Sequence, residues 1–156
     1  MLLKMCRELE VEYLIGDMLI DGEHKQIIDT ACAFSEGIES GTLSYRDALN
    51  MLRVVLSHIN THFQHEELLL KLYNADSADI ELHKREHVRL KIILTAAMEN
   101  LREQEQEDAG FKEACITLAG NLYDLITNHI LTVDKQTLLP CVTKQSEFYS
   151  LFARKP

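Results

Sequence analysis

The stretch HINTHFQHEE, which begins at residue 58, holds three histidines and two glutamates within ten positions. Imidazole and carboxylate groups are the side chains that most often bind transition metals in proteins. If the stretch is helical, His62 and Glu66 lie one turn apart on the face that also carries Val55 and Ile59. The sequence therefore predicts that one imidazole and one carboxylate point together into the interior of the protein.

The other two histidines of this stretch, His58 and His65, fall close together on one flank of that face, about 20° apart at 100° per residue. Partly exposed side chains without a special role are one interpretation of the pair, because histidine is commonly intermediate in burial. Alternatively, His58 tunes a site that His62 and Glu66 form. Glu67 is expected to face solvent.

Apolar residues recur at alternating steps of three and four along four segments of the chain, which predicts four amphipathic helices. Each apolar stripe contains at least one histidine. The four stripes are Ile20, His24, Ile27, Ala31, Phe34 and Ile38; Ala48, Leu52, Val55, Ile59, His62, Glu66, Leu69 and Tyr73; Ile80, His83, His87, Leu90, Leu94, Ala97 and Leu101; and Phe111, Cys115, Leu118, Leu122, Leu125 and His129. No strand pattern of any length occurs, and the fold class is predicted to be all-α.

Capping and breaking residues place the ends of these helices. Asp21 is expected to be the N-cap of the first helix, and Ser44 with Asp47 resembles a capping box at the start of the second. Pro140 is expected to bound the fourth helix. Four long helices with short connections predict an up-down-up-down four-helix bundle.

The chain divides into three predicted parts. Residues 1–20 form an N-terminal arm, residues 21–137 form the bundle, and residues 138–156 form a C-terminal extension. The extension is either a short helix or the start of a linker to a further domain.

Polar residues in the stripes point to one shared site. In an antiparallel bundle, candidates near the start of the first and third helices meet candidates near the end of the second and fourth. Burying so many imidazoles and a carboxylate without partners would cost several kcal/mol, so a metal site is the better explanation. Asp134 follows His129 by five residues, about 140° away on an α-helix. His129 and Asp134 can bind at one site only if the helix is locally distorted or if the Asp134 carboxylate extends across the site as a bridge.

Four short motifs resemble those of the hemerythrin family, in its bacterial branch. IDGEHK is similar to I-D-x-x-H-K, HFQHEE to H-F-x-x-E-E, HKREH to H-x-x-x-H, and HILTVD to H-I-x-x-x-D. Their order and approximate separations agree over residues 13–135. The resemblance implies a non-haem di-iron site with seven ligands: His24, His62, Glu66, His83, His87, His129 and Asp134.

The resemblance also implies how the irons are held. His83, His87 and His129 would bind one iron. The second iron would be bound by His24 and His62. Both carboxylates would bridge the irons together with an oxo or hydroxo group, and dioxygen would bind at the open position of the second iron. Ile126 is a candidate for the apolar oxygen pocket.

The chain departs from the family in having no tryptophan. Family members usually carry one early in the arm and often one four residues before the last histidine. Tyr13 and Leu125 stand near those places here. The packing of the arm and part of the pocket are therefore open, whereas the ligands are unaffected.

The expected function is reversible dioxygen binding, for storage or delivery, and no enzyme activity is expected. The alternative is an oxygen or redox sensory domain, in which oxygen binding or a diferrous/diferric change shifts the helices; a signalling domain after the C-terminal extension would favour it. An oxidase or peroxidase is a third reading. The Glu-x-x-His motifs of ferritin-like oxidising sites do not occur here.

Composition limits the partners. The net charge of −9 argues against a nucleic-acid partner and against an anionic membrane surface. No apolar run approaches membrane-spanning length. The four cysteines, Cys6, Cys32, Cys115 and Cys141, are scattered without a CxxC pair, which favours reduced thiols in a cytoplasmic protein.

Overall fold

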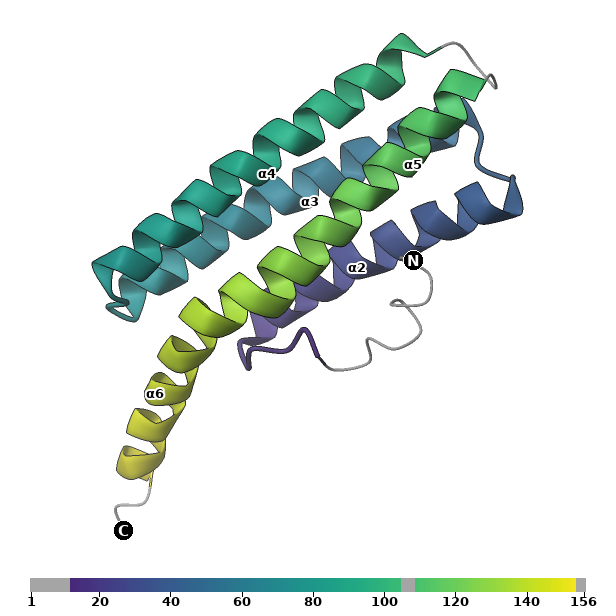
Figure 1. The fold of residues 1–156 in the computed structure, drawn as a ribbon. Coiled ribbons are helices and arrows are strands. Elements are labelled where there is room, and N and C mark those ends of the chain that lie inside the picture. The colour runs from purple at the N-terminus through teal and green to yellow at the C-terminus, as the bar shows by residue number, and fades with distance from the viewer. Residues whose placement is uncertain (1–11, 105–108, 154–156) are drawn as a thin grey trace.

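The computed structural model describes residues 12–104 and 109–153, and every regular element among them is a helix. The elements are α2 (Met18–Ser40), α3 (Tyr45–Leu72), α4 (Ser77–Glu103), α5 (Ala109–Asp124), the π-helix η1 (Leu125–Asp134) and α6 (Lys135–Ala153). Helices α2, α3, α4 and α5 are antiparallel neighbours in sequence order, and α5 returns to pack against α2 (Figure 1). The predicted all-α four-helix bundle is confirmed.

The fourth helix of the bundle is one continuous helical segment made of α5, η1 and α6, and it changes direction between α5 and α6 (Figure 1). It runs along the bundle as α5, changes hydrogen-bonding pattern in η1, and leaves the end of the bundle as α6 (Figure 1). A proline inside α6, Pro140, removes one backbone donor without ending the helix. The prediction that Pro140 bounds the helix is therefore wrong, because a proline can bend a helix whose first turns are held by other contacts.

Two apolar clusters fill the interior. The larger one runs along the bundle and contains most of the predicted stripe residues, whereas the smaller one, Ile15, Ile20, Leu70 and Leu138, closes one end. The stripes are buried along nearly their whole length; the exceptions lie near helix ends, where Ile38, Leu69, Tyr73 and Ile80 are only partly buried. The histidines of the stripes fall in the interval between the two clusters.

The N-cap of α2 is Asp17, whose side chain accepts hydrogen bonds from the backbone N–H groups of Leu19 and Ile20. The prediction of Asp21 as the cap is wrong. The Asp21 carboxylate instead accepts from the N–H groups of Ile15 and Gly16, at 2.7 and 3.1 Å. Gly16 has a φ of +91°, a conformation that favours glycine. Asp21 thus braces the turn that leads from the arm into α2.

The N-cap of α3 is confirmed. Ser44 accepts a hydrogen bond from the backbone N–H of Asp47 at 3.1 Å, and its hydroxyl donates to the Asp47 carboxylate at 2.6 Å. This reciprocal arrangement satisfies a donor that the first turn of a helix otherwise leaves free.

The predicted division into arm, bundle and extension stays a prediction. Residues 1–11 of the arm lie outside the described residues, and α6 runs through the predicted boundary at residue 137 without a break. Cys115 and Cys141 are free thiols, whereas Cys32 is disulfide-bonded. The expectation of reduced thiols is therefore wrong for Cys32, because sequence spacing does not show which cysteines a fold brings together; Cys6 lies outside the described residues.

Candidate metal centre

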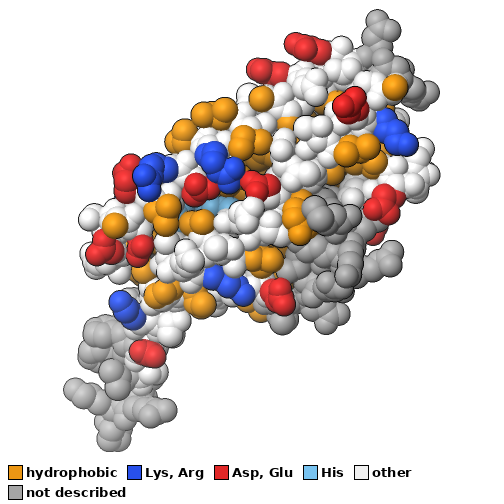
Figure 2. All heavy atoms as spheres, viewed as in Figure 1, with side chains coloured by type: hydrophobic (Ala, Val, Ile, Leu, Met, Phe, Trp, Pro, Cys, Tyr) orange, Lys and Arg blue, Asp and Glu red, His pale blue; other side chains and the backbone are white. Residues whose placement is uncertain are grey.

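Seven polar side chains meet in the interior near the end of the bundle that the smaller apolar cluster closes. All seven are fully buried or nearly so, with at most 1% of each exposed. They are His24 from α2, His62 and Glu66 from α3, His83 and His87 from α4, and His129 and Asp134 from η1. These are the residues that the sequence predicted, and the structure brings all of them together. Figure 2 shows only a small area of histidine on this face, surrounded by acidic and basic side chains.

The Glu66 carboxylate lies at the middle of the cluster. Its Oε1 is 3.1 Å from Nε2 of His62 and 3.5 Å from Nε2 of His24. Its Oε2 is 3.0 Å from Nε2 of His87 and 3.2 Å from Nε2 of His83. The two oxygens thus face two different sets of imidazoles.

Asp134 divides its oxygens in the same way. Oδ2 is 3.1 Å from Nε2 of His24, whereas Oδ1 is 3.3 Å from Nε2 of both His83 and His129. The helix is distorted here, as the five-residue spacing required: Leu125–Asp134 is a π-helix. Its longer i→i+5 turn brings the fifth residue back to nearly the same face.

The candidate ligand atoms form two groups, within each of which all atoms lie within 4.8 Å of one another. One group consists of Glu66, His83, His87 and His129, and the other of His24, His62, Glu66 and Asp134. Glu66 belongs to both. Two adjacent cation positions that share a carboxylate would account for this arrangement.

Most of the imidazoles are anchored from behind by acceptors on other elements. The Nδ1–H of His24 donates to the carbonyl oxygen of Tyr13 at 3.0 Å, and that of His62 donates to Glu23 on α2 at 3.1 Å. Because a carbonyl or carboxylate only accepts hydrogen bonds, a proton sits on Nδ1. Each Nε2 then faces inward, where it can offer a lone pair to a cation once its own proton has left.

The histidines of α4 are anchored in the same manner. His87 donates from Nδ1 to Glu67 on α3 at 3.0 Å. His83 donates to the Thr137 hydroxyl on α6 at 2.8 Å, and that hydroxyl donates in turn to the backbone carbonyl of Val133. Outer partners of this kind orient metal-binding imidazoles and raise their basicity.

Several polar atoms facing the interior have no hydrogen-bond partner among the described residues. They include Nε2 of His62, Oε1 of Glu66 and Oδ1 of Asp134. His62 Nε2 and Glu66 Oε1 are 3.1 Å apart but lack hydrogen-bond geometry. Leaving such groups unsatisfied costs about 1–3 kcal/mol each. Metal cations between them would satisfy these atoms, so the residues present fit a metal centre.

The two histidines of the second group hold protons tightly in the absence of metal. Burial works to lower the pKa of His24, but the hydrogen bond to Asp134 and the close approach of the Glu66 carboxylate outweigh it and raise this pKa to about 9. For His62, burial is likewise outweighed, here by the attraction of Glu66 and the hydrogen bond to Glu23, which raise the pKa to about 10. A cation must displace these protons.

The remaining shifts follow from the same contacts. Burial works to raise the pKa of Glu66, but the surrounding imidazoles hold it well below its usual range. Burial lowers the pKa of His87 despite its contact with Glu66. Burial also works to lower the pKa of His129, but the attraction of Asp134 raises it overall. Glu66 is therefore an anion in the metal-free protein.

Phe63 forms one wall of the site. Its ring is fully buried and stacks on the imidazole of His87, with centroids 3.8 Å apart and an interplanar angle of 6°. It also meets the ring of His129 edge-on, with centroids 5.4 Å apart. This apolar ring restricts both imidazoles to their orientations. Phe63 is the second residue of the motif HFQHEE, but the sequence did not predict a role for it.

The sequence missed the residues that anchor the imidazoles. Glu23 immediately precedes His24, and Glu67 immediately follows Glu66; Glu67 contacts His87 and has only 28% of its side chain exposed, so the expectation that it faces solvent is wrong. The sequence offered one indication of these anchoring residues, namely that each of the two glutamates lies directly beside a candidate ligand. Tyr13 acts through its backbone, which side-chain type cannot reveal.

The flanking histidines differ from each other. His65 is about one-third exposed and donates from Nδ1 to Glu23 at 2.6 Å. It therefore touches the site through Glu23. His58 is partly buried, and its Nδ1 has no hydrogen-bond partner among the described residues. Ile126 is fully buried in the larger apolar cluster, and its place in an oxygen pocket stays a prediction.

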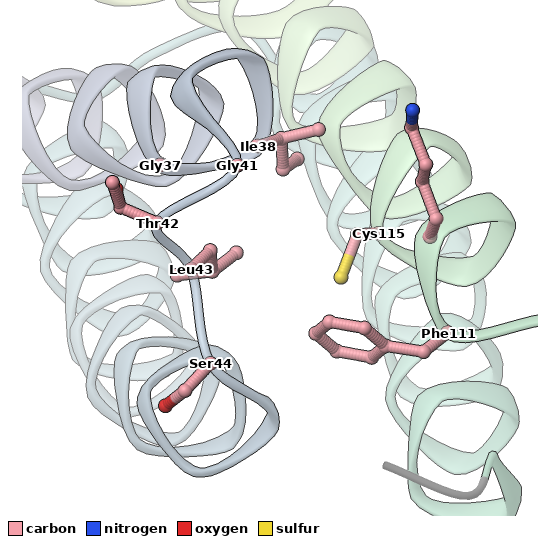
Figure 3. A pocket seen from close by; sticks show the side chains of 9 residues that line it. Gly37, Ile38, Gly41, Thr42, Leu43, Ser44, Phe111 and Cys115 are labelled. Carbon is pink, nitrogen blue, oxygen red and sulfur yellow. The ribbon is translucent and has the colours of Figure 1, made fainter. Parts of the chain in front are cut away.

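A cavity of about 440 Å³ lies at the other end of the bundle, where α2 ends and α3 and α5 begin. Leu43, Phe111 and Cys115 point into it (Figure 3). None of the described residues that line it is histidine, aspartate or glutamate. It is separate from the metal centre.

A four-helix bundle with five imidazoles and two carboxylates converging in its core defines a metal-binding helical protein. The family model of the hemerythrin HHE cation binding domain matches residues 16–141. Since the match spans most of the chain, the protein belongs to this family, and the family resemblance seen in the sequence is confirmed. Comparisons with curated proteins and with solved structures gave no significant match.

The helices of the bundle are amphipathic. No helix in the described part of the chain combines the length and the apolar character needed to cross a membrane.

Proposed function

We propose that the chain holds two iron ions and binds dioxygen reversibly. The observation that carries the proposal is the pair of ligand groups that share Glu66 in a fully buried setting. Membership in a cation-binding family supports metal as the occupant, and the mixture of imidazoles and carboxylates suits iron.

The two groups are unequal, which supports an open position. Counting one oxygen from each carboxylate, one group has three imidazoles and two oxygens, whereas the other, at His24 and His62, has two imidazoles and two oxygens. The second cation would therefore have one ligand fewer. A small molecule such as dioxygen would add there, and an oxo or hydroxo group would complete the bridge. An iron pair held by these residues would supply the electrons that dioxygen binding requires.

The protein's own residues favour binding over catalysis. Among the described residues, the buried polar side chains other than the seven candidate ligands are Ser35 and Thr137. The Thr137 hydroxyl is occupied by His83 and a backbone carbonyl, so it is not free to transfer protons to a substrate. The apolar clusters on both sides of the site keep water away, which slows oxidation of the metal. We propose a carrier or store, not an enzyme.

A sensory role is the second candidate, and the path of α6 supports it. Asp134 ends η1, Thr137 lies in the first turn of α6 and contacts His83, and α6 then projects beyond the bundle (Figure 1). A change at the site would therefore act directly on the base of a projecting helix. Such a helix can transmit the change to a partner or to a further domain.

The two roles are distinguished by an optical experiment on iron-loaded, reduced protein. Metal analysis should give about two irons per chain, one for each of the two ligand groups. A visible band that appears in air and disappears on oxygen removal supports the carrier. Rapid, lasting conversion to the diferric form supports the sensor. If the chain bound no iron, or if His87→Ala and Glu66→Ala left iron binding unchanged, the proposal would be wrong.

A further inference from the structure

Two carboxylates outside the ligand set stand behind the centre in matching positions. Glu23 accepts from His62, a ligand of one group, and Glu67 accepts from His87, a ligand of the other. Each of these glutamates is adjacent in sequence to a ligand of its own helix and contacts a ligand of the next helix. Neutral oxygens serve His24 and His83. Each group thus has one imidazole backed by a carboxylate.

This difference in acceptor has an electronic consequence. A carboxylate that accepts from Nδ1–H draws the proton away from the ring and makes Nε2 a stronger electron donor than a carbonyl or hydroxyl acceptor does. Stronger donation stabilises the more highly charged state of a bound metal. Both carboxylates are largely shielded, with 16% of the Glu23 side chain and 28% of the Glu67 side chain exposed, so solvent screens them only in part.

We propose that Glu23 and Glu67 are positioning residues that set the reduction potential and the affinity of the metal centre, one for each metal, through His62 and His87. The inference rests on the proposed two-metal site. It concerns what these two carboxylates do to the site, beyond holding the imidazoles in place. With both present, the centre favours the oxidised metal more strongly than the seven ligands alone would.

His65 supplies an opposing effect. It donates to Oε1 of Glu23 at 2.6 Å, while His62 donates to Oε2. A second donor takes up part of the electron density of the carboxylate and weakens its pull on His62. Removal of the His65 imidazole should therefore increase the electron donation from Glu23 through His62 to the metal. Removal of the Glu23 charge should decrease that donation. Glu67 has no second histidine donor among the described contacts, so only one metal is adjusted in this way.

The experiment compares Glu23→Gln and Glu67→Gln with wild type, because glutamine keeps an accepting oxygen and loses the charge. Midpoint potentials are measured by redox titration of iron-loaded protein, and affinities by competition with a chelator. Each variant should raise the potential and weaken metal binding by about 10- to 100-fold, the usual effect of losing an outer partner. His65→Ala should lower the potential. Glu36→Gln, about 20 Å further along α2 and exposed, should change neither.

A second readout uses the metal-free protein. Imidazole N–H signals in the NMR spectrum of ¹⁵N-histidine-labelled chain should show protected Nδ1–H protons on His62 and His87, which are sensitive to Glu23→Gln and Glu67→Gln respectively. If both variants keep wild-type potential and affinity, even with changed N–H signals or lower folding stability, the inference is wrong and the two carboxylates only hold the fold. If wild type itself binds no metal while the N–H signals are as expected, the proposed function fails and this inference fails with it.

Discussion

Nε2 of His129 lies 3.3 Å from Oδ1 of Asp134, although five residues separate the two in the chain. On an α-helix they would point about 140° apart. The π-helical turn of η1 closes that angle, since each of its hydrogen bonds spans one residue more. The backbone of η1 therefore helps to form the candidate metal centre, in agreement with the frequent occurrence of π-helical turns at functional sites.

Asp134→Asn should strongly weaken metal binding while the bundle still folds. Asparagine has nearly the same shape but offers one oxygen, so it cannot serve both groups. Because loss of an outer partner already costs about 10- to 100-fold in affinity, loss of this carboxylate should cost more. A competition titration with a chelator measures it. Asp124→Asn is the matched control: Asp124 immediately precedes η1 and pairs with Arg89 on the surface. Equal affinities in the two variants would contradict the assignment.

Much of the site could be predicted because its signal is local. His62 with Glu66, and His83 with His87, are four residues apart on apolar stripes, and that spacing alone places each pair on one buried face. The seven candidate ligands follow from the apolar stripes and from the motifs that resemble the family. The role of Asp134 was less certain from the sequence, because a helical wheel assumes α-helical geometry.

What could not be predicted depends on contacts between helices. Glu23 reaches His62 across from α2 to α3, and Thr137 reaches His83 from α6 to α4. No spacing within one helix encodes these pairs. The start of α2 was misplaced because Asp17 and Asp21 are both acceptable caps by type, and only the turn at Gly16 decides between them.

The metal-free protein should lose stability as the pH rises above neutrality. In the unfolded chain, histidine has a pKa of about 6.5, whereas in the fold that of His24 is about 9. A raised folded pKa gives stability that is complete below the unfolded pKa and is lost as the pH rises through the folded pKa. For His24 the loss is on the order of 3 kcal/mol. His62, with a pKa of about 10, shifts stability in the same direction, but the two share Glu66 and do not add.

Urea denaturation of metal-free protein between about pH 7 and pH 10 measures this loss. The midpoint should fall steadily over the range. Metal-loaded protein is the control, because metal holds the inward imidazole nitrogens without protons, and its midpoint should fall less. A midpoint that stays constant or rises in the metal-free protein would contradict the protonated state of His24 and His62.

Phe63→Leu should affect both stability and the metal centre, whereas Phe34→Leu should affect stability alone. Both phenylalanines are buried, with at most 2% exposed, so each substitution should cost up to about 1.5 kcal/mol in free energy of unfolding. Only Phe63 stacks on His87, so only its loss frees an imidazole to change orientation. Chelator competition and urea denaturation measure the two effects. An unchanged affinity in Phe63→Leu, at matched loss of stability, would show that the stacking does not orient His87.

Ile126→Ala tests the predicted oxygen pocket. Ile126 is fully buried and lies about one turn before His129, on the side of the larger apolar cluster. Its truncation removes apolar cover without removing a ligand, so iron content should stay at about two per chain while water reaches the metals more easily. The reduced, iron-loaded variant should therefore pass to the diferric form faster in air than wild type, as followed by its visible spectrum. Leu122→Ala, a truncation in the same cluster about one further turn away, controls for loss of packing. If both variants oxidise at the same rate, Ile126 does not belong specifically to the oxygen pocket. Water would then be excluded by the apolar core as a whole.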